Sequence, residues 1–171
     1  MSFSFAGQGT IRPARAADIR ALEWHGGPDL RSWYEACWRD HQSGALTLLV
    51  ADLSGFPIGQ IVVVWNGKPS HPHFPDLQSL RVHPAFRGGG IGSTLLEAAE
   101  TLVAKRGFPQ SGLSVNLDNP HARRLYERLG YRATGAVYDE KWSYRDAHGN
   151  LVELTERVAD LVKDLEVEAR T

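Results

Sequence analysis

Glycine is concentrated in one short segment of this chain, and that segment constrains the fold more than any other. Four of the 17 glycines lie within residues 88–92, directly after Arg87 and at the start of a long amphipathic helix predicted over 91–106. Glycines let several backbone N–H groups point into one concavity, and a helix N-terminus adds about half a positive charge. Arg87 adds a full charge with a fork of donors. The pattern favours a phosphate-binding loop over its alternative, a plain glycine turn.

Two common nucleotide-binding motifs match this segment poorly. A Walker loop needs a lysine before its hydroxyl residue, but here Ser93 directly follows Gly92. A dinucleotide fingerprint read from Gly88 and Gly90 needs a third small residue, where Ser93 fits poorly, and the preceding strands look like a hairpin rather than a βαβ unit. Hydrolysis of nucleoside triphosphates and dinucleotide binding are therefore both disfavoured.

The length and charge of the chain narrow the remaining classes of protein. Its 171 residues suffice for a single domain, 1–171, with its own hydrophobic core. The 19 Lys and Arg side chains are balanced by 20 Asp and Glu, so neither nucleic acid nor a membrane is expected as the main partner. The single Cys37 and the lack of a signal-like or membrane-spanning apolar run predict a cytoplasmic protein. We expect a monomer or a homodimer.

Hydrophobic periodicity and turn residues predict alternating strands and helices. The predicted elements are a strand at 10–14, helices at 16–24 and 29–41, a hairpin of 45–52 and 58–65, a loop at 66–75, a strand at 77–83, a helix at 91–106, a strand at 112–117, a helix at 120–129 and an extended segment at 131–144. This order indicates an α/β sandwich with a mixed sheet, in which 77–117 forms one βαβ unit.

The C-terminal segment 151–168 fits two kinds of secondary structure. Leu154, Val158 and Leu161 recur at helical spacing, whereas Val152, Leu154 and Val158 can also be read as alternation. The pattern alone favours a helix.

Two signatures occur in the right order and at the right separation for one known family. The first is Val82-His83-Pro84-Ala85-Phe86-Arg87-Gly88-Gly89-Gly90-Ile91-Gly92, a Val-x-Pro turn followed by Arg-x-x-Gly-x-Gly. The second consists of Asn119, Ala122, Leu125-Tyr126 and Gly130-Tyr131. Through them the segment 77–131 resembles the GNAT family, the general N-acetyltransferases that use acetyl-coenzyme A.

The resemblance implies a fold and a place for the coenzyme. It implies a GNAT-like α/β sandwich, whose mixed, mostly antiparallel central sheet is flanked by helices. Strands around 77–83 and 112–117 are expected to splay apart, and the pantetheine arm of the coenzyme would lie in the gap like an added strand. A closing strand beside 112–117 is also implied, so we expect a strand at 158–165 against the helical period.

The resemblance also assigns the contacts of acetyl-coenzyme A, residue by residue. The expected coenzyme-binding residues are Leu80, Val82, Arg87, Gly88, Gly89, Gly90, Ile91, Gly92, Ser93, Asn119 and Tyr126. Asn119 has a second possible role as the N-cap of a helix that starts at Pro120, and one polar position can serve both. No metal is expected, because His71 and His73 supply only two ligands.

Two residues are candidates for the chemistry of acetyl transfer. Tyr126 matches the family's general acid for the leaving thiolate, with core packing as its alternative role. Asp76 aligns with an acidic residue of many relatives and is the candidate base, with a solvated turn carboxylate as its alternative; Glu23 and His83 are weaker candidates. The expected reaction is acetyl transfer to a primary amine of a small molecule or peptide, by direct attack in a ternary complex. A non-catalytic GNAT-like module that binds coenzyme A or a partner is the alternative.

The signatures predict the surroundings of the acceptor amine. In this fold the segments 26–30, 66–76 and 138–142 would face a bound acyl group. Three tryptophans are candidates to line the pocket, with core packing as the alternative for each: Trp24, Trp65 and Trp142.

Overall fold

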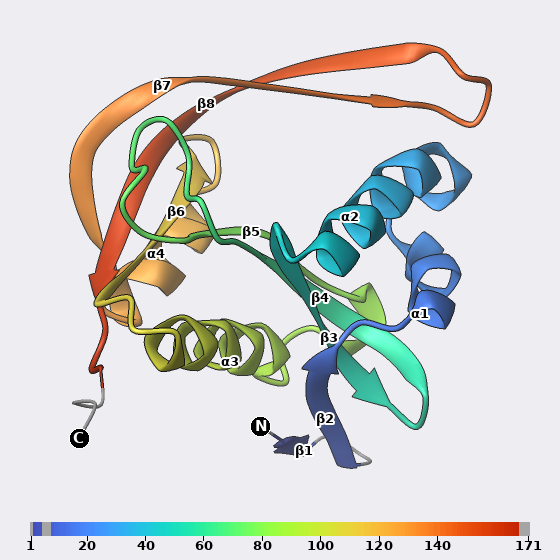
Figure 1. The fold of residues 1–171 in the computed structure, drawn as a ribbon, viewed down its shortest axis with the longest axis horizontal. Coiled ribbons are helices and arrows are strands. Elements are labelled where there is room, and N and C mark those ends of the chain that lie inside the picture. Colours follow the sequence, from blue (N-terminus) through green and yellow to red (C-terminus); the bar gives the residue numbers. More distant parts are fainter. Residues whose placement is uncertain (1, 5–7, 168–171) are drawn as a thin grey trace.

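A mixed β-sheet with helices on both faces organises the chain. The computed structural model describes residues 2–4 and 8–167, and within them the sheet has eight strands in the order β1-β2-β3-β4-β5-β6-β8-β7 (Figure 1). Neighbouring strands are antiparallel except for the parallel pair β5–β6. The strands are β1 (Ser2–Ser4), β2 (Gln8–Pro13), β3 (Leu46–Leu53), β4 (Phe56–Val64), β5 (Asp76–Val82), β6 (Gln110–Asn116), β7 (Arg132–Arg145) and β8 (Leu151–Asp164). The expected mixed, mostly antiparallel sandwich is confirmed.

The helices cover the sheet in two layers. They are α1 (Ala16–Ala21), α2 (Arg31–Ser43), α3 (Ile91–Lys105) and α4 (Pro120–Arg128), with short 3-10 turns at Leu22–Trp24, Gly27–Leu30 and Pro84–Phe86. The first predicted helix, 16–24, is α-helical only to Ala21 and then tightens into the first of these turns. Among the residues that the structure describes, no helix is both long and apolar enough to cross a membrane.

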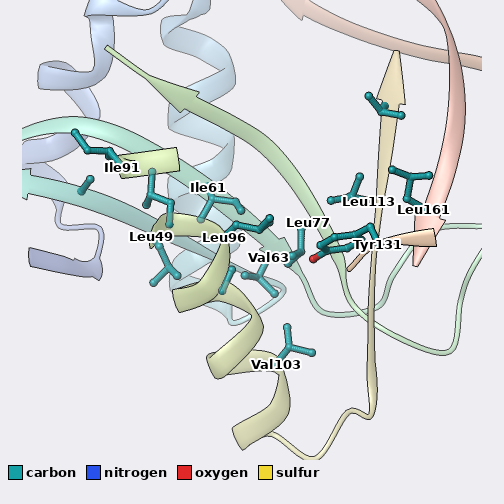
Figure 2. Packing of buried hydrophobic residues seen from close by; sticks show 14 of the residues in the cluster. Leu49, Ile61, Val63, Leu77, Ile91, Leu96, Val103, Leu113, Tyr131 and Leu161 are labelled. Carbon is teal, nitrogen blue, oxygen red and sulfur yellow. The ribbon is translucent and has the colours of Figure 1, made fainter. Parts of the chain in front are cut away.

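Each face of the sheet has its own hydrophobic core, because consecutive side chains of a strand point to opposite sides. On one face Leu49 and Ile61 pack in a cluster with α3 (Figure 2). On the other face Leu48 and Val62 pack with α1 and α2 around the fully buried Tyr34. The uninterrupted apolar runs of β3 and β4 therefore belong to strands that are covered on both sides.

Strands β5 and β6 pair only at one end and then separate. Their register contains only Asp76 opposite Gly112 and Leu77 opposite Leu113, so the splay expected from the resemblance is confirmed. The register between β4 and β5 shifts at the same place, and Ser79 there has a positive φ of 53°. An extra residue in one strand bends that strand and turns it away from its neighbour. The bulge thus accompanies the opening of the sheet.

The C-terminal segment is a strand, so the helical pattern was misleading. Strand β8 spans Leu151–Asp164, and the strand expected at 158–165 is its second half. Residues 158–162 are buried because β8 lies there between β6 and β7, and both of its faces are covered. The first half of β8 pairs with β7 in a long hairpin that runs toward α2 (Figure 1). At its far end the Ser32 hydroxyl donates to the Arg145 carbonyl at 2.7 Å.

Candidate active site

The gap between β5 and β6 exposes backbone groups of β5 that no strand uses. The His83 N–H donates to the Ile58 carbonyl on β4 at 2.8 Å, and alternation along an antiparallel pair then points the Val82 N–H and C=O into the gap. The Val82 carbonyl accepts a bond from Arg87 Nε at 3.0 Å, and the Leu80 carbonyl accepts one from Arg81 at 3.2 Å. Both carbonyls are thus held by flexible side chains, which an extended ligand can displace.

The glycine segment lies at the N-terminus of α3 and has the geometry of an anion cradle. Gly88 and Gly90 have φ values of 82° and 80°, a region that residues with a Cβ rarely occupy. The first bond of the helix joins the Thr94 N–H to the Gly90 carbonyl at 3.0 Å. The N–H groups of Ile91, Gly92 and Ser93 therefore have no acceptor within the helix, and they are available to an anion together with Arg87.

A cleft of about 650 Å³ occupies the region between the splayed strands, α4 and the β7–β8 hairpin. Four of the candidate residues line it together: Asp76, Leu80, Asn119 and Tyr126. The glycine segment does not line the cleft; Arg87 joins the two regions through its bond to the Val82 carbonyl. Residues 113–116, 118 and 140–142 also line it, so β6 and the hairpin both face the cleft.

Tyr126 lies on α4 with its ring packed edge-on against Tyr131, at 5.9 Å between ring centroids. Tyr126 lines the cleft and also packs against the core, a position compatible with both of the roles considered for it. Among the described residues its hydroxyl has no hydrogen-bond partner. Burial raises the pKa of Tyr126, and the charge of Arg81 opposes that rise. The hydroxyl is therefore protonated at neutral pH and can donate a hydrogen bond.

Asn119 has the predicted capping role. Its side-chain oxygen accepts the Ala122 N–H at 3.0 Å, and Pro120 begins the helix behind it. The residue also lines the cleft, where its amide nitrogen can donate to a ligand. One position thus serves both the helix start and the cleft wall.

Asp76 is buried at the start of β5, and the alternative of a solvated turn carboxylate is wrong. Its exposed fraction is 0%. The carboxylate accepts from His71 Nε2 at 2.8 Å and from Gln78 Nε2 at 2.7 Å, and Lys68 Nζ lies 3.8 Å away. Asp76 therefore belongs to a polar network at the end of the cleft where β5 and β6 still pair.

The rest of this network joins the 66–75 loop to β6, β7 and β8. Lys68 donates to the Ser114 hydroxyl at 2.7 Å and to Glu140. Burial alone would lower the pKa of Lys68, but the charges of Asp76 and Glu140 and the bonds to its neighbours raise it overall. On the far side, His71 Nδ1 lies 3.4 Å from Asp160, which is also buried. His71, considered above with His73, is thus placed between two carboxylates.

The weaker candidates lie outside the cleft. Glu23 pairs with Arg31 at 2.7 Å, and the His83 ring accepts the Ala85 N–H at 3.2 Å in the turn before the glycine segment. Neither residue lines the cleft. Of the three tryptophans, only Trp142 lines it. Trp24 donates to the Pro57 carbonyl, and Trp65 is buried in the core, so packing accounts for both.

One group of cleft residues was not found from the sequence. Arg81 on β5 donates through Nε to His25 Nε2 at 3.1 Å, and His25 Nδ1 lies 3.3 Å from the Tyr34 hydroxyl. His25 and Arg81 both line the cleft. The sequence gives little indication of this group, because its three residues come from a loop, a helix and a strand that only the folded chain brings together.

Comparisons with known proteins agree with this geometry. Residues 14–131 match the acetyltransferase (GNAT) family. Similar solved structures include an N-acetyltransferase from Staphylococcus aureus, with a TM-score of 0.68, 17% identity and coverage of 92% of this chain and 99% of that one. A GNAT superfamily phosphinothricin acetyltransferase from Sinorhizobium meliloti, in complex with AcCoA, has a TM-score of 0.65 and 21% identity, with coverage of 95% of this chain and 92% of that one. The ribosomal-protein-S18-alanine N-acetyltransferase from Escherichia coli has a TM-score of 0.66 and 20% identity, with coverage of 95% of this chain and 99% of that one.

At these identities the solved structures show a shared fold, and the family match covers more than half of the chain. The chain belongs to the GNAT family of acetyltransferases.

Proposed function

We propose that this protein transfers an acetyl group from acetyl-coenzyme A to a primary amine of a small molecule or peptide, by direct attack in a ternary complex in the cytoplasm. The observation that carries the proposal is the splayed pair β5–β6. Its open edge suits the pantetheine arm of the coenzyme, and the adjacent glycine segment suits the pyrophosphate. The family match supports acetyl-coenzyme A as the donor, and one similar protein was solved in complex with AcCoA.

The residues present fit this donor. The free N–H groups at 91–93 and the Arg87 guanidinium suit a pyrophosphate, and the Val82 and Leu80 backbone groups suit the amides of a pantetheine arm. Asn119 faces the same cleft and would contact that arm. The bound donor supplies an activated acyl group, and the chain supplies orientation and proton transfer.

Direct attack is favoured over an acyl-enzyme because the chain offers no suitable thiol. Its single cysteine, Cys37, is buried in the core between the sheet and helices α1 and α2. Burial and, to a smaller extent, the charge of Asp40 raise the pKa of Cys37 to about 12. A thiol of this kind is almost entirely protonated at neutral pH and is a poor nucleophile.

The acceptor must lose a proton before it can attack. A free alkylamine has a pKa of about 10.4, so only about one molecule in a few thousand is neutral at pH 7. Asp76 is the proposed proton acceptor, because it is the candidate base that lines the cleft and is supported by His71 and Gln78. Because Asp76 is fully buried, the proton would reach it through a relay and not by direct contact with the amine.

Charge then develops on the thioester oxygen and on the leaving sulfur. The Val82 N–H, which points into the gap, is a candidate donor to the oxyanion, as is that of Leu80. Tyr126 would donate to the leaving thiolate. Its ordinary pKa of about 10 is already above that of a thiol, about 8.5, and burial raises it further. We therefore assign Tyr126 a strong hydrogen bond that becomes proton transfer only as the carbon–sulfur bond breaks.

The test combines a coenzyme titration with an acceptor screen. Calorimetry with coenzyme A should show saturable binding, and acetyl-coenzyme A with a panel of primary amines should release free thiol in a protein-dependent way. Binding without thiol release for any amine would instead support the non-catalytic module. No binding at millimolar coenzyme would exclude both functions.

A further inference from the structure

Arg81 stands out among the cleft residues because its hydrogen-bond partners carry no opposite charge. The guanidinium donates through Nε to His25 Nε2 at 3.1 Å and through NH1 to the Leu80 carbonyl at 3.2 Å. Both partners are neutral acceptors. Among the described residues, no carboxylate lies within 4.0 Å of Arg81, whereas Arg12 on β2 pairs with both Asp18 and Asp52.

The bond to Arg81 also fixes the chemical state of His25. A guanidinium can only donate, so His25 Nε2 must offer a lone pair, and the proton of the neutral ring is then on Nδ1. Nδ1 lies 3.3 Å from the Tyr34 hydroxyl and can donate to it. Burial first, and then the charges of Arg81 and Arg87, lower the pKa of His25, so the ring stays neutral at neutral pH.

Tyr34 anchors this arrangement to the core. Its exposed fraction is 0%, and it lies on α2 within the cluster that packs α1 and α2 against the sheet. Holding a side chain in its binding orientation before the ligand arrives reduces the entropy lost on binding. The chain from Tyr34 through His25 thus holds the Arg81 fork in place while leaving its charge uncompensated.

Arg81 is not part of the glycine segment, although the charge of Arg87 also acts on its partner His25. Its partner His25 lies in the segment between α1 and α2, which covers the face of the sheet opposite α3, and the glycine segment opens α3. The same wall carries Leu30 and Trp33 beside His25. A planar fork with free donors suits a carboxylate or a phosphate. The location of Arg81, on the wall that carries His25 and not at the glycine segment, points to a ligand other than the pyrophosphate.

We propose that Arg81 binds a carboxylate of the acceptor, so that the substrate is an amine that also carries an acid group. This inference rests on the proposed function and specifies its substrate class. His25 is a positioning residue, which holds Arg81 and does not contact the reacting atoms. An amine that carries no acid group would leave the Arg81 guanidinium without a partner of opposite charge.

Matched acceptors test the proposal. The protein is assayed by thiol release with L-amino acids and with the corresponding L-amino acid amides, which keep the amine and lose the carboxylate. We expect kcat/KM for the acids to exceed that for the amides by about 10- to 100-fold, after correction for the neutral fraction of each amine. Thiol release with equal efficiency for both sets would overturn the carboxylate site and leave the acetyltransferase proposal intact. No thiol release with either set or with the wider amine panel would refute both.

Variants locate the effect. In Arg81→Gln the ratio of kcat/KM for the acids to that for the amides should fall to within about threefold of one. Arg81→Lys should keep part of the preference for acids. Arg39→Gln, at an exposed position of α2 away from the cleft, is the matched control and should keep the full preference. The coenzyme A dissociation constant of Arg81→Gln, measured by calorimetry, should match that of the unaltered protein. A large rise in that constant with an unchanged preference would assign Arg81 to the coenzyme instead.

Discussion

The two ends of the cleft use polar side chains in opposite ways. At the end where β5 still pairs with β6, the buried Asp76, His71 and Asp160 contact one another, and the half-buried Lys68 pairs with Asp76. At the end where the strands have separated, groups face the cleft without partners of opposite charge, as Arg81 does among the described residues. The polar side chains of the first end use one another as hydrogen-bond partners, whereas those of the second end remain available to ligands.

This contrast separates the residues that serve function from those that serve stability. Buried charges that lose one partner destabilise a protein strongly, whereas an unpartnered group at a cleft can change without disturbing the fold. Substitutions at the open end should therefore affect turnover more than unfolding, and substitutions deep in the closed end should do the reverse. Asp76 faces the cleft and belongs to the network, so it should show both effects.

The largest expected effect is at the open end, at Tyr126. Tyr126→Phe should lower kcat by about 10²–10⁴-fold, because the leaving thiolate loses its donor, while the unfolding midpoint stays within a few degrees. Tyr131→Phe is the control, since the Tyr131 hydroxyl donates to Glu100 at 2.9 Å within the core. It should cost about 1 kcal/mol of stability and leave kcat nearly unchanged. Turnover of Tyr126→Phe within threefold of the unaltered protein would remove Tyr126 from the mechanism.

Asp76 should come next, and its effect should depend on pH. Asp76→Asn should lower kcat/KM by about 10²-fold at pH 7, because the amide cannot accept the amine's proton. The loss should shrink toward pH 9, where a larger fraction of the acceptor is already neutral. Steady-state kinetics at both values measure the ratio. A loss that is equal at every pH would indicate that Asp76 only supports His71 and the local structure.

The closed end is best probed at Asp160, whose exposed fraction is 1%. Burial raises its pKa, but bonds from Ser114, Ser70 and Tyr138 lower the pKa overall. Asp160→Ala should cost about 3 kcal/mol in the free energy of unfolding measured with urea.

Asp139→Ala is the matched control for Asp160 on the same hairpin. Asp139 pairs with Arg157 at 3.0 Å, with more than half of each side chain exposed, and its loss should cost less than about 1 kcal/mol. Equal costs for the two variants would mean that the closed end is no more important to stability than a surface ion pair.

The sequence was most informative where function depends on the backbone. The cradle at 88–92 and the N-cap at Asn119 rest on local chemistry, since only glycine tolerates the φ values found and only a short polar side chain caps a helix well. Such requirements are visible in a few consecutive residues. The splay of β5 and β6 could be expected only through the resemblance to a family.

The network and the Arg81 site could not be predicted in the same way. For Asp76 the sequence left a solvated turn carboxylate open as an alternative to the base, because the burial of a strand's first residue depends on the 66–75 loop that folds over it. His25 and Arg81 are 56 residues apart and meet only after α1 and α2 pack on the sheet. The secondary structure of β8 was hard to predict for a related reason. The spacing of its leucines fits a helix, but the segment is a strand because it lies between β6 and β7 in the sheet.

The smallest expected effect tests whether His25 is neutral in the folded protein. Because the pKa of His25 is lowered on folding, the unfolded chain binds a proton more readily as the pH falls through about 6.5, and stability should decline below that value. Urea unfolding at pH 7.5 and 5.5 should therefore show a smaller decline for His25→Gln than for the unaltered protein. Burial also lowers the pKa of His41, but His41 contributes equally to the decline in the variant and in the unaltered protein. Identical declines would show that His25 becomes charged freely in the folded state, and a charged ring could not accept the bond that orients Arg81.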